Sequence, residues 1–336
     1  PYARSISVAA GDGRINCATP YSLFFLNEDD NTLNRLTTIQ GLNDVGVSKI
    51  GYNDPYNTLL IAYSNANIDL IKGNTIINMA DVFNSSAITP EEKTINNILF
   101  IDKYAYLSCG FGIVVIDLSK EEVSDTYYIG PEGSHLQVLD LAFTEELFFA
   151  ATEDGIYTAD RNDPNLAFFG SWTKDLTMPE PNATYNHIDN NAGTIYVNRY
   201  TEAFKEDKKY FLRDGSWLTD DEAFSDEDVN DMKSFNGELF VSYNYFLKSF
   251  DTDHNPIKII WTYYTETGGP NISGIDLEGD VLWMADARYG LVSERNNEFK
   301  FYTPNSPKKA DVFDMDLAGG HLWTADGGRN LSWGNI

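Results

Sequence analysis

The sequence contains few of the residues that build metal centres and disulfide frameworks. Its 336 residues include only two cysteines and four histidines. No histidine has a cysteine or a second histidine at ligand spacing, so no zinc site is predicted. Cys17 and Cys109 fall in repeat units that are not neighbours in the chain, as the repeat pattern below shows. We therefore expect two small buried thiols and no disulfide between them.

Basic residues and long apolar runs are also scarce. Lysine and arginine number 24 against 51 aspartates and glutamates, which gives a net charge of −27. A field of this sign repels phosphate backbones, so nucleic-acid binding is not expected. The longest apolar run, residues 111–118, is far shorter than the roughly 18 to 20 residues of a membrane helix, so no transmembrane segment is predicted. Residues 1–30 lack a basic stretch followed by an apolar one, so either the protein is not exported or a signal has been removed.

Motifs that bind cofactors or metals are missing too. The sequence has no P-loop and no nucleophile elbow, and the "GFG" of residues 110–112 lacks the third glycine and the following helix of a dinucleotide site. "DTDHNP", which begins at Asp251, starts like a calcium loop. However, Pro256 replaces the required glycine and Thr262 replaces the bidentate glutamate. We therefore predict neither a cofactor nor a bound metal.

What the sequence does contain is a repeated phrase rich in aromatic residues. "GDVLWMADARYGL" begins at Gly279, and "GGHLWTADGGRNL" begins at Gly319. Similar turns before an apolar strand recur at intervals of 41 to 47 residues, at Gly13, Asn57, Lys103, Glu146, Gly193, Gly237, Gly279 and Gly320. This period matches the blade of a β-propeller, which has about 40 to 50 residues.

The interior of one repeat indicates four strands. In residues 272–304, "ISGIDLEG" alternates apolar and polar residues, "VLWMADA" is almost continuously apolar, "GLVSERNN" alternates again, and "FKFYTP" is short and aromatic. A continuously apolar strand is expected where blades cover both of its faces. We therefore predict an all-β protein, a β-propeller of four-stranded antiparallel blades.

The number of blades is left open by the pattern. Residues 1–311 form seven repeats of about 44 residues, and residues 312–336 form a partial eighth. This last part either completes an eight-bladed ring with an N-terminal strand or is the truncated start of a second propeller. Few residues precede Ser5, too few for a good closing strand, so a seven-bladed ring is favoured.

The loops between second and third strands, together with those between blades, gather on one face of a propeller, where ligands commonly bind. Arginine and aromatic side chains in such loops suit stacking on a sugar or anchoring a protein, although ordinary exposed loops contain them as well. The candidate ligand-binding residues on this face are Asn65, Phe111, Asp154, Arg199, Tyr245, Arg288, Tyr289 and Arg329.

Acidic residues offer two further candidates. Asp286 and Asp326 follow the alanine of the repeated phrase, and as repeat-equivalent acids they are expected to support turns and not to form a catalytic pair. The charged segment "TEAFKEDKK" interrupts the fifth repeat as a loop. The acidic residues of 219–231 are interpreted as a solvated loop between blades, with a cation or partner site as the alternative.

Three stretches resemble a known family. "CATPYSLFFLNEDDN" from Cys17, "LLIAYSNANIDLIKGNTIINM" at residues 59–79 and "INNILFIDKYAYLSCGFGIVVIDLSKEEVSDTYYIG" at residues 95–130 look like the N-terminal propeller of PorZ, from the type IX secretion system of Bacteroidetes. The resemblance covers roughly residues 15 to 160. Two-component-regulator propellers are more distantly similar, but they usually have threonine where this chain has Asp286 and Asp326.

The resemblance implies a cell-surface, non-enzymatic protein with two propellers and a C-terminal sorting sandwich. Such a protein acts beside the sortase PorU in processing secreted cargo and anchoring it to anionic lipopolysaccharide. This chain has no room for the second propeller and the sandwich, so we expect it to be a fragment or a separated domain. The family pattern transfers no individual ligand residue to this sequence.

Three functions follow as hypotheses. The first is a binding and scaffold module of the secretion attachment complex, located outside the cell at the outer membrane. The second is a periplasmic glycan-sensing propeller of a hybrid two-component histidine kinase, and the third is a carbohydrate lyase or hydrolase. In all three cases the acidic chain binds an anionic glycan only through local arginine or lysine residues or a bridging cation.

Overall fold

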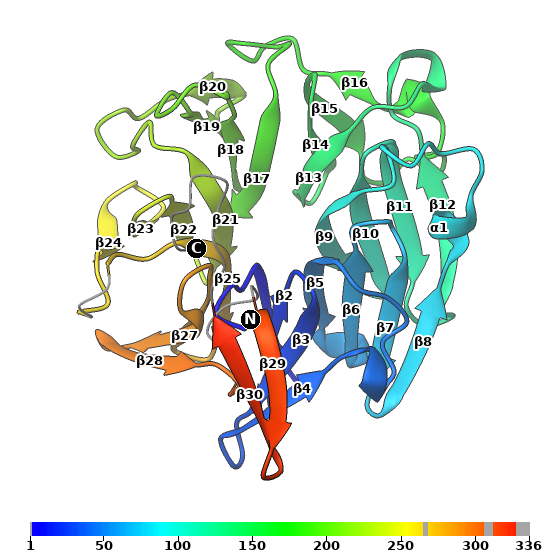
Figure 1. Cartoon of the computed structure of the whole chain (residues 1–336). Helices are drawn as coiled ribbons and strands as arrows, with labels where there is room; N and C mark the ends of the chain where they lie inside the picture. Colours follow the sequence, from blue (N-terminus) through cyan, green and yellow to red (C-terminus); the bar gives the residue numbers. More distant parts are fainter. Residues whose placement is uncertain (1, 265–267, 306–311, 327–336) are drawn as a thin grey trace, which may run out of the picture.

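Seven four-stranded antiparallel sheets stand around a common axis (Figure 1). The structure is a computed structural model and describes residues 2–264, 268–305 and 312–326. Each sheet is one blade, built from four strands that are consecutive in the chain. The prediction of an all-β propeller with seven blades is confirmed.

The blades follow the sequence repeats in order. Blade 1 consists of β1 (Ser7–Gly11), β2 (Arg14–Thr19), β3 (Ser22–Asn27) and β4 (Thr32–Leu36); blade 2 of β5 (Val47–Asn53), β6 (Thr58–Tyr63), β7 (Ile68–Lys72) and β8 (Thr75–Met79); blade 3 of β9 (Ile95–Ile101), β10 (Tyr104–Cys109), β11 (Gly112–Asp117) and β12 (Glu122–Tyr127); blade 4 of β13 (Val138–Phe143), β14 (Leu147–Thr152), β15 (Gly155–Asp160) and β16 (Thr173–Lys174).

The remaining strands are distributed in the same way. Blade 5 consists of β17 (Tyr185–Asn191), β18 (Thr194–Arg199), β19 (Lys208–Arg213) and β20 (Ser216–Leu218); blade 6 of β21 (Val229–Phe235), β22 (Glu238–Tyr243), β23 (Leu247–Phe250) and β24 (Pro256–Ile260); blade 7 of β25 (Ile272–Glu278), β26 (Val281–Asp286), β27 (Gly290–Arg295) and β28 (Glu298–Tyr302). A separate hairpin contains β29 (Val312–Ala318) and β30 (His321–Asp326).

Helical segments are short. They are α1 (Asp81–Asn84) and the 3-10 turns Thr38–Gln40, Asp54–Tyr56, Pro131–Gly133 and Phe169–Ser171. Within the described ranges, no helix has the length and apolar character needed to span a bilayer.

The predicted turns lie between the first and second strands of each blade. The first strands of successive blades contact one another around the ring, which places them nearest the axis. Second strands are covered on both faces: β6 is buried along its whole length, whereas the outermost β4 has no buried residue. The continuous apolar pattern of the second strands therefore reflects burial between neighbouring blades.

Apolar clusters join the blades. Seven clusters of buried side chains occur in the described part of the chain, and each takes its members from two neighbouring blades. Between blades 2 and 3, for example, Leu60 and Leu70 share a cluster with Leu107 and Phe111. Burial of each large apolar side chain contributes about 1.5 to 3 kcal/mol, so these contacts between blades supply most of the cohesion of the ring.

The two cysteines occupy such clusters. Cys17 belongs to the cluster between blades 1 and 7, and Cys109 to that between blades 2 and 3. Both are free and buried, as predicted. Burial raises the pKa of each thiol to about 12, so neither is a reactive thiolate.

The ring closes between blade 1 and blade 7. The Ser5 backbone N–H donates to the Asp286 carbonyl (3.2 Å), and the Gly290 N–H donates to the Ala3 carbonyl (2.9 Å). β1 lies against β25, where a Cβ on Gly274 would come within 3.1 Å of the Ser7 Cα. Glycine at this position therefore permits the close approach of the first and last blades.

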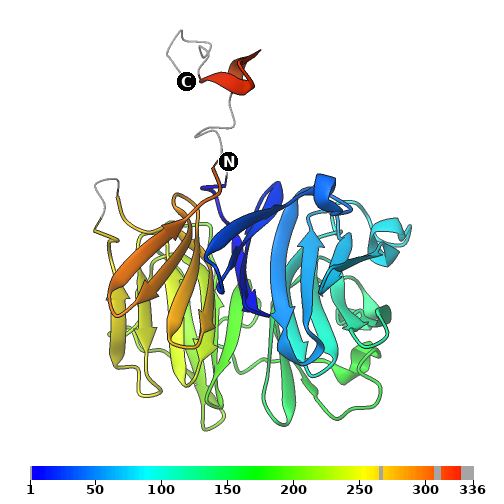
Figure 2. The same cartoon turned by 90° about the horizontal axis from the view of Figure 1, so that it is seen from below.

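The hairpin β29–β30 repeats blade 7 but lies outside the ring (Figure 2). Ile275 pairs with Met284 in blade 7, and Met315 pairs with Thr324 in the hairpin, with a register shift at the same place in each pair of strands. The side chains of Met315, Leu317 and Trp323 are exposed. The alternative of an eight-bladed ring is thus not what the chain forms. The possibility that residues 312–336 begin a second propeller stays a prediction, and residues 327–336 lie outside the described ranges.

Aspartates link the innermost strands of blades 4 to 7 and blade 1; Asp140 and Asp231 are buried, and Asp189 and Asp276 are partly buried. Carboxylate oxygens accept backbone N–H groups of the next blade, in the pairs Asp140–Ile188 (3.1 Å), Asp231–Ile275 (2.9 Å), Asp276–Ala10 (2.8 Å) and Asp189–Ser234. The sequence pattern did not predict these links, because an aspartate on an inner strand gives no sign of its acceptor on another blade. At Ile188 and Ile275 the carboxylate satisfies a donor that would otherwise be buried without a partner.

We expect Asp231→Ala to lower the free energy of unfolding by about 1 to 3 kcal/mol, because the Ile275 N–H loses its acceptor. Asp29→Ala, in the exposed β3–β4 turn, is the control and should change stability by less than about 0.5 kcal/mol. Denaturant unfolding of both variants measures the difference. Equal stabilities of the two variants would contradict the role given to Asp231.

The Asp189 and Asp140 carboxyl groups predict an unusual dependence of stability on pH. Burial raises the pKa of Asp140 to about 6 and that of Asp189 to about 7, and Asp140 adds to the shift at Asp189. A folded-state pKa above the unfolded value of about 3.9 means that protonation favours folding. This contribution is fully present below about pH 4 and is lost as the pH rises through 6 and 7.

Asp189→Asn removes one of these titrations. Between about pH 5 and pH 8, the wild type should lose about 1 to 3 kcal/mol of stability relative to the variant, because the amide cannot ionise. Burial lowers the pKa of His187 to about 4, so the titration of His187 makes stability rise with pH. His187 is present in both proteins, so its contribution cancels in the difference between them. The measurement is chemical unfolding at several pH values. A difference between the two proteins that is constant across this range would show that Asp189 does not titrate as described.

Candidate functional site

The candidate site is the face that carries the turns between second and third strands and the connections between blades, here called the upper face. Antiparallel alternation places these turns and connections at the same end of every blade. The predicted residues with described positions lie in these turns or beside them, one or two in each of blades 2 to 7. Arg329 lies outside the described residues. The candidate residues therefore share the upper face but are spread over six blades.

Several of the predicted polar residues are occupied by contacts within the protein. The Asn65 amide donates to Asp44 (2.7 Å), and Asp154 pairs with Lys174 (2.8 Å). The Arg288 guanidinium donates to the Gly269 carbonyl (3.3 Å). These contacts hold turns in place and leave less of each side chain for a ligand.

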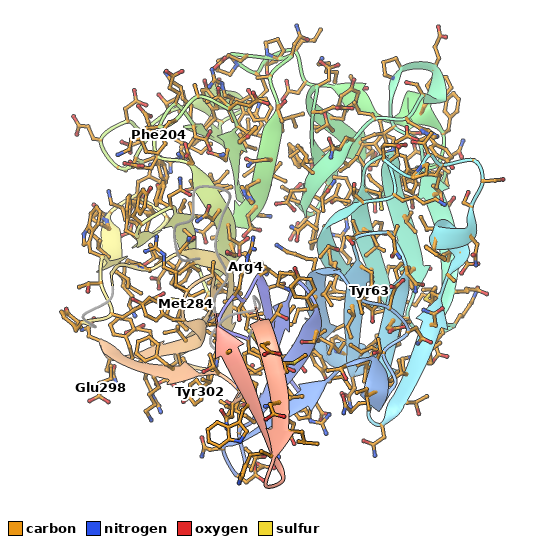
Figure 3. All side chains as sticks on the ribbon, in the orientation of Figure 1. Arg4, Tyr63, Phe204, Met284, Glu298 and Tyr302 are labelled. Atoms are coloured by element: carbon orange, nitrogen blue, oxygen red, sulfur yellow. The ribbon has the colours of Figure 1, made fainter. Side chains whose placement is uncertain are left out.

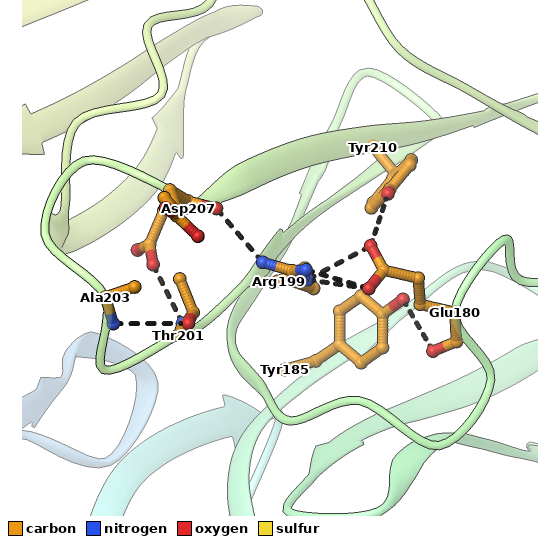
Figure 4. Close-up of polar contacts among 8 residues, drawn as sticks. Glu180, Tyr185, Arg199, Thr201, Ala203, Asp207 and Tyr210 are labelled. Carbon is orange, nitrogen blue, oxygen red and sulfur yellow. Dashed lines mark hydrogen bonds and ion pairs between the residues drawn. The ribbon is translucent and has the colours of Figure 1, made fainter.

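Arg199 is the most extensively bonded of the predicted residues (Figure 4). Its guanidinium binds both oxygens of Glu180 at 2.8 to 3.1 Å and also donates to the Glu206 carbonyl (3.0 Å). Tyr210 donates a further hydrogen bond to Glu180 (3.1 Å). The Arg199 contact and this hydrogen bond hold the pKa of Glu180 below its usual value. Arg199 therefore fixes the long β18–β19 loop and is not a free binding cation.

Phe111 corrects the sequence prediction. It was expected to be an exposed turn residue, but its side chain is fully buried in the cluster between blades 2 and 3. Tyr128 and His135 lie near it and stack on each other, with ring centroids 5.2 Å apart. A phenylalanine in a short turn gives no sequence signal for this inward orientation.

Tyr289 and Asp286 both serve the β26–β27 turn and its surroundings. The Tyr289 hydroxyl donates to the Gly268 carbonyl (3.1 Å). Asp286 is fully buried; one carboxylate oxygen accepts from the Tyr263 hydroxyl (2.9 Å), and the other accepts from the Arg288 N–H (2.7 Å). With both oxygens engaged and no exposure, Asp286 supports the turn, as its repeated position predicted.

Four exposed aromatic side chains lie in the upper-face loops of blades 5 and 6. We call this set, with its exposed fractions, the aromatic patch: Tyr200 (42%), Phe204 (61%), Tyr245 (49%) and Trp261 (54%). Phe204 lies on the outer part of blade 5 (Figure 3). Only Tyr245 was predicted. The others were missed because they lie in long connections where the repeat pattern is lost.

Asp228 holds two loops of the aromatic patch together. Its carboxylate accepts from the Lys205 backbone N–H (3.0 Å) in the β18–β19 loop and from the Asn244 amide (2.7 Å) in the β22–β23 turn. Trp261 lies against Phe246, with ring centroids 4.2 Å apart. Neighbouring blades therefore present these rings from anchored loops, which lowers the entropy lost when a partner binds.

The acidic segment of residues 219–231 is an anchored connection between blades. Its Phe224 is buried, and the Lys209 ammonium donates to the Ser225 and Glu227 carbonyls at 2.7 and 2.8 Å. Burial lowers the pKa of Lys209 to about 8. Asp220 accepts from His254, whose ring is buried beside Tyr196. The segment is thus less solvated than predicted.

Metal ligation finds no support in this geometry. Among residues 2–264, 268–305 and 312–326, no group of three or more histidine, cysteine, aspartate or glutamate side chains is placed to hold a metal ion. In "DTDHNP", one Asp251 oxygen accepts from the Asp253 and Asn255 N–H groups at 2.9 and 2.8 Å, which makes the segment a turn.

Comparison with known proteins supports the family resemblance. The sequence model of the PorZ N-terminal β-propeller domain of the type IX secretion system matches residues 15–173. No curated protein matches the chain. A solved structure of PorZ, an essential bacterial surface component of the type IX secretion system of Porphyromonas gingivalis, is similar with a TM-score of 0.77 and 17% identity. The match covers 98% of this chain and 43% of that one, so this chain spans less than half of that PorZ chain.

Two other solved structures share the fold at lower similarity. A chain of the mitotic checkpoint complex has a TM-score of 0.62 at 12% identity, covering 90% of this chain and 92% of that one. The computationally designed Ika8 protein has a TM-score of 0.57 at 9% identity, covering 90% and 97%. These two likenesses concern the fold alone, whereas the family match also concerns the sequence. Over residues 15–173 the chain is therefore similar in sequence to the PorZ N-terminal β-propeller domain, and the propeller fold it shares with the solved PorZ structure extends over the whole ring.

Proposed function

We propose that this propeller is a non-enzymatic binding and scaffold module of a PorZ-like component of the type IX secretion system. The observation that carries the proposal is the family match over residues 15–173, which includes the blades where the sequence resemblance is most specific. In this role the protein acts at the cell surface, within the attachment complex that processes secreted cargo and anchors it there.

The upper face supports a binding role. Aromatic side chains that are exposed and held by anchored loops are typical of the residues that dominate protein interfaces. The aromatic patch has this character on blades 5 and 6. Asp286, one of the two repeat-equivalent acids that were weighed as a catalytic pair, is buried and has both carboxylate oxygens bonded, which favours binding over turnover.

The charge of the protein indicates what kind of partner the patch suits. The net charge of −27 repels anionic ligands at long range, and Arg199 on this face is already paired with Glu180. We therefore assign the aromatic patch to a protein partner, for which a PorU-like sortase is the candidate by family resemblance. Anionic lipopolysaccharide remains a candidate partner of the complex and requires cationic groups elsewhere.

The hairpin β29–β30 supports a continuation of the repeat. It has the register of β25–β26, and its exposed Met315, Leu317 and Trp323 lack the cover that blade 7 obtains from its neighbours. We propose that it is the first hairpin of another blade, consistent with the length of the PorZ chain that this protein matches in part.

Deletion of the complete gene in its own bacterium tests the proposed function. We expect type IX cargo to accumulate unprocessed and to be lost from the cell surface, because its attachment complex lacks a scaffold. Immunoblotting of cell envelopes and medium for a cargo protein measures this, and re-introduction of the gene is the control. Normal cargo processing in the deletion strain would contradict the proposal.

The aromatic patch is tested by complementing this strain with the Phe204→Ala/Tyr245→Ala double variant. Loss of two exposed anchors should weaken partner binding about tenfold or more, and cargo processing should fall with it. Tyr21→Ala is the matched control, since Tyr21 is an exposed tyrosine in the β2–β3 turn of the same face. Complementation by the double variant as complete as that by Tyr21→Ala would exclude the patch.

A further inference from the structure

The outermost strand of blade 6 carries exposed apolar side chains. β24 lies on the rim of the ring (Figure 1) and, in the described part of the chain, pairs with β23 alone. Ile257 is 54% exposed, Ile259 is 44% exposed, and Trp261, which directly follows the strand, is 54% exposed. We call these three residues the β24 stripe. In the equivalent strands β4 and β12, by contrast, every exposed residue is polar.

The β24 stripe lies on one face of its blade, because its residues occupy alternate positions. This is the face toward blade 5, since the Trp261 ring lies against Phe246 (ring centroids 4.2 Å apart), which belongs to the cluster between blades 5 and 6. The intervening residues serve the other face. Ile260 is buried in the cluster between blades 6 and 7, and Lys258 pairs with Glu294 of blade 7. Only one face of β24 is therefore covered by a neighbouring blade.

Blade 5 leaves the other face open because its own outer strand is short. β20 has three residues, and the chain leaves the blade at Leu218, which is itself 43% exposed. At the two preceding junctions, a tryptophan from the outermost strand or the loop before it is buried between the blades: Trp172 between blades 3 and 4, and Trp217 between blades 4 and 5. Between blades 5 and 6, Phe224 covers Phe250 (ring centroids 4.8 Å apart) but leaves the β24 stripe exposed.

Acidic side chains accompany the β24 stripe. The connection between blades 5 and 6 follows the junction, since its Asp220 accepts from His254 (2.9 Å) in the β23–β24 turn and its Asp228 accepts from Asn244 (2.7 Å) in the β22–β23 turn. Exposed acids of this connection and of the β23–β24 turn are Asp221, Glu222, Asp226 and Asp253.

The cations beside the stripe are fewer than the acids. Arg213 donates to the Thr252 carbonyl (3.2 Å), and the Lys248 ammonium lies over the Phe246 ring, 5.8 Å from its centroid. Lys258 is neutralised by its partner Glu294. The local charge therefore has the same sign as the net charge of −27, and it favours a basic partner.

From these features we propose that β24 binds an extended segment of another protein, one with alternating apolar residues and a positive net charge. An edge strand with exposed apolar side chains is a template for a further strand, whose main chain pairs with the free N–H and C=O groups of the edge. Apolar residues of the added segment contact the β24 stripe, and its basic residues face the acids beside it. A second copy of this chain carries the same net charge of −27, so like charges oppose the pairing of β24 with itself.

The surface lies on the side of the ring and shares only Trp261 with the aromatic patch. A segment paired with β24 runs along the rim and reaches the upper face at Trp261. The inference thus adds a second interaction surface to the proposed binding role and does not rest on that role.

The class of partner is tested with a fluorescently labelled octapeptide of alternating valine and lysine, whose binding to the purified chain is followed by fluorescence anisotropy. We expect it to bind about tenfold or more tightly than a serine–lysine octapeptide, which has the same charge but no apolar side chains, and than a valine–glutamate octapeptide. Equal binding of either comparison peptide would overturn the assignment to an apolar, basic segment.

The Ile257→Thr/Ile259→Thr double variant locates the valine–lysine peptide. It should weaken binding by about tenfold, because it removes two apolar contacts while threonine keeps a branched Cβ that suits a strand. Ile39→Thr is the matched control, since Ile39 is a 91% exposed isoleucine in the 3-10 turn Thr38–Gln40, and its affinity should be unchanged. Equal affinities of the double variant and Ile39→Thr would place the peptide elsewhere and contradict the proposal.

The acids beside the stripe are tested by Asp221→Asn/Glu222→Gln. This variant should weaken binding of the valine–lysine peptide about threefold or more, because two attractive charges are lost. Glu145→Gln/Glu146→Gln makes the same change in net charge at two exposed acids of the β13–β14 turn and should have the smaller effect. Equal effects of the two variants would show that the peptide responds only to the overall charge, against the proposal.

Hydrogen exchange and sedimentation test the mode of binding. The backbone amides of residues 257–261 should exchange about tenfold or more slowly when the valine–lysine peptide is bound, and unchanged exchange there would exclude strand addition. The chain without peptide should sediment as a monomer. A dimer that Ile257→Thr/Ile259→Thr abolishes would assign β24 to a second copy and overturn the proposal. All these measurements use the purified chain and synthetic peptides, so their outcome is independent of the role in secretion.

Discussion

The contact between neighbouring blades is the constraint on which the rest of the structure depends. No blade can bury both faces of its second strand by itself, and each does so only between two others. The ring must therefore close, and the chain achieves this by laying residues 3–5 against the β26–β27 turn. Seven apolar clusters and a set of aspartate links hold the blades side by side. As a result, the turns between second and third strands all lie on the upper face.

This arrangement separates stability from binding. Residues that resembled site residues in the sequence, such as Arg199 and Asp286, are largely used to fix loops and turns. Exposed aromatic rings occur where the connections between strands are long, as in the β18–β19 loop with Phe204. The exposed rings that we propose to bind a partner thus lie at departures from the repeat.

The sequence predicted the features that repeat from blade to blade and missed those that depart from the repeat. The turn glycines and the apolar second strands repeat with a fixed period, and they were sufficient to predict blades, strand order and free buried cysteines. The inward orientation of Phe111 and the carboxylate links such as Asp231 to Ile275 were not predictable. Each depends on which side chain of another blade lies opposite, and no local pattern in the chain contains that information.

Thermal unfolding of two truncated chains tests the central claim most directly, because the account assigns ring closure to the N-terminus and not to the hairpin β29–β30. Removal of residues 306–336 should leave the unfolding midpoint unchanged, whereas removal of residues 1–5 should lower it, since blade 7 loses its backbone bonds to Ala3 and Ser5. The opposite result, a protein destabilised by loss of residues 306–336 and indifferent to loss of residues 1–5, would contradict a ring of seven blades closed in this way.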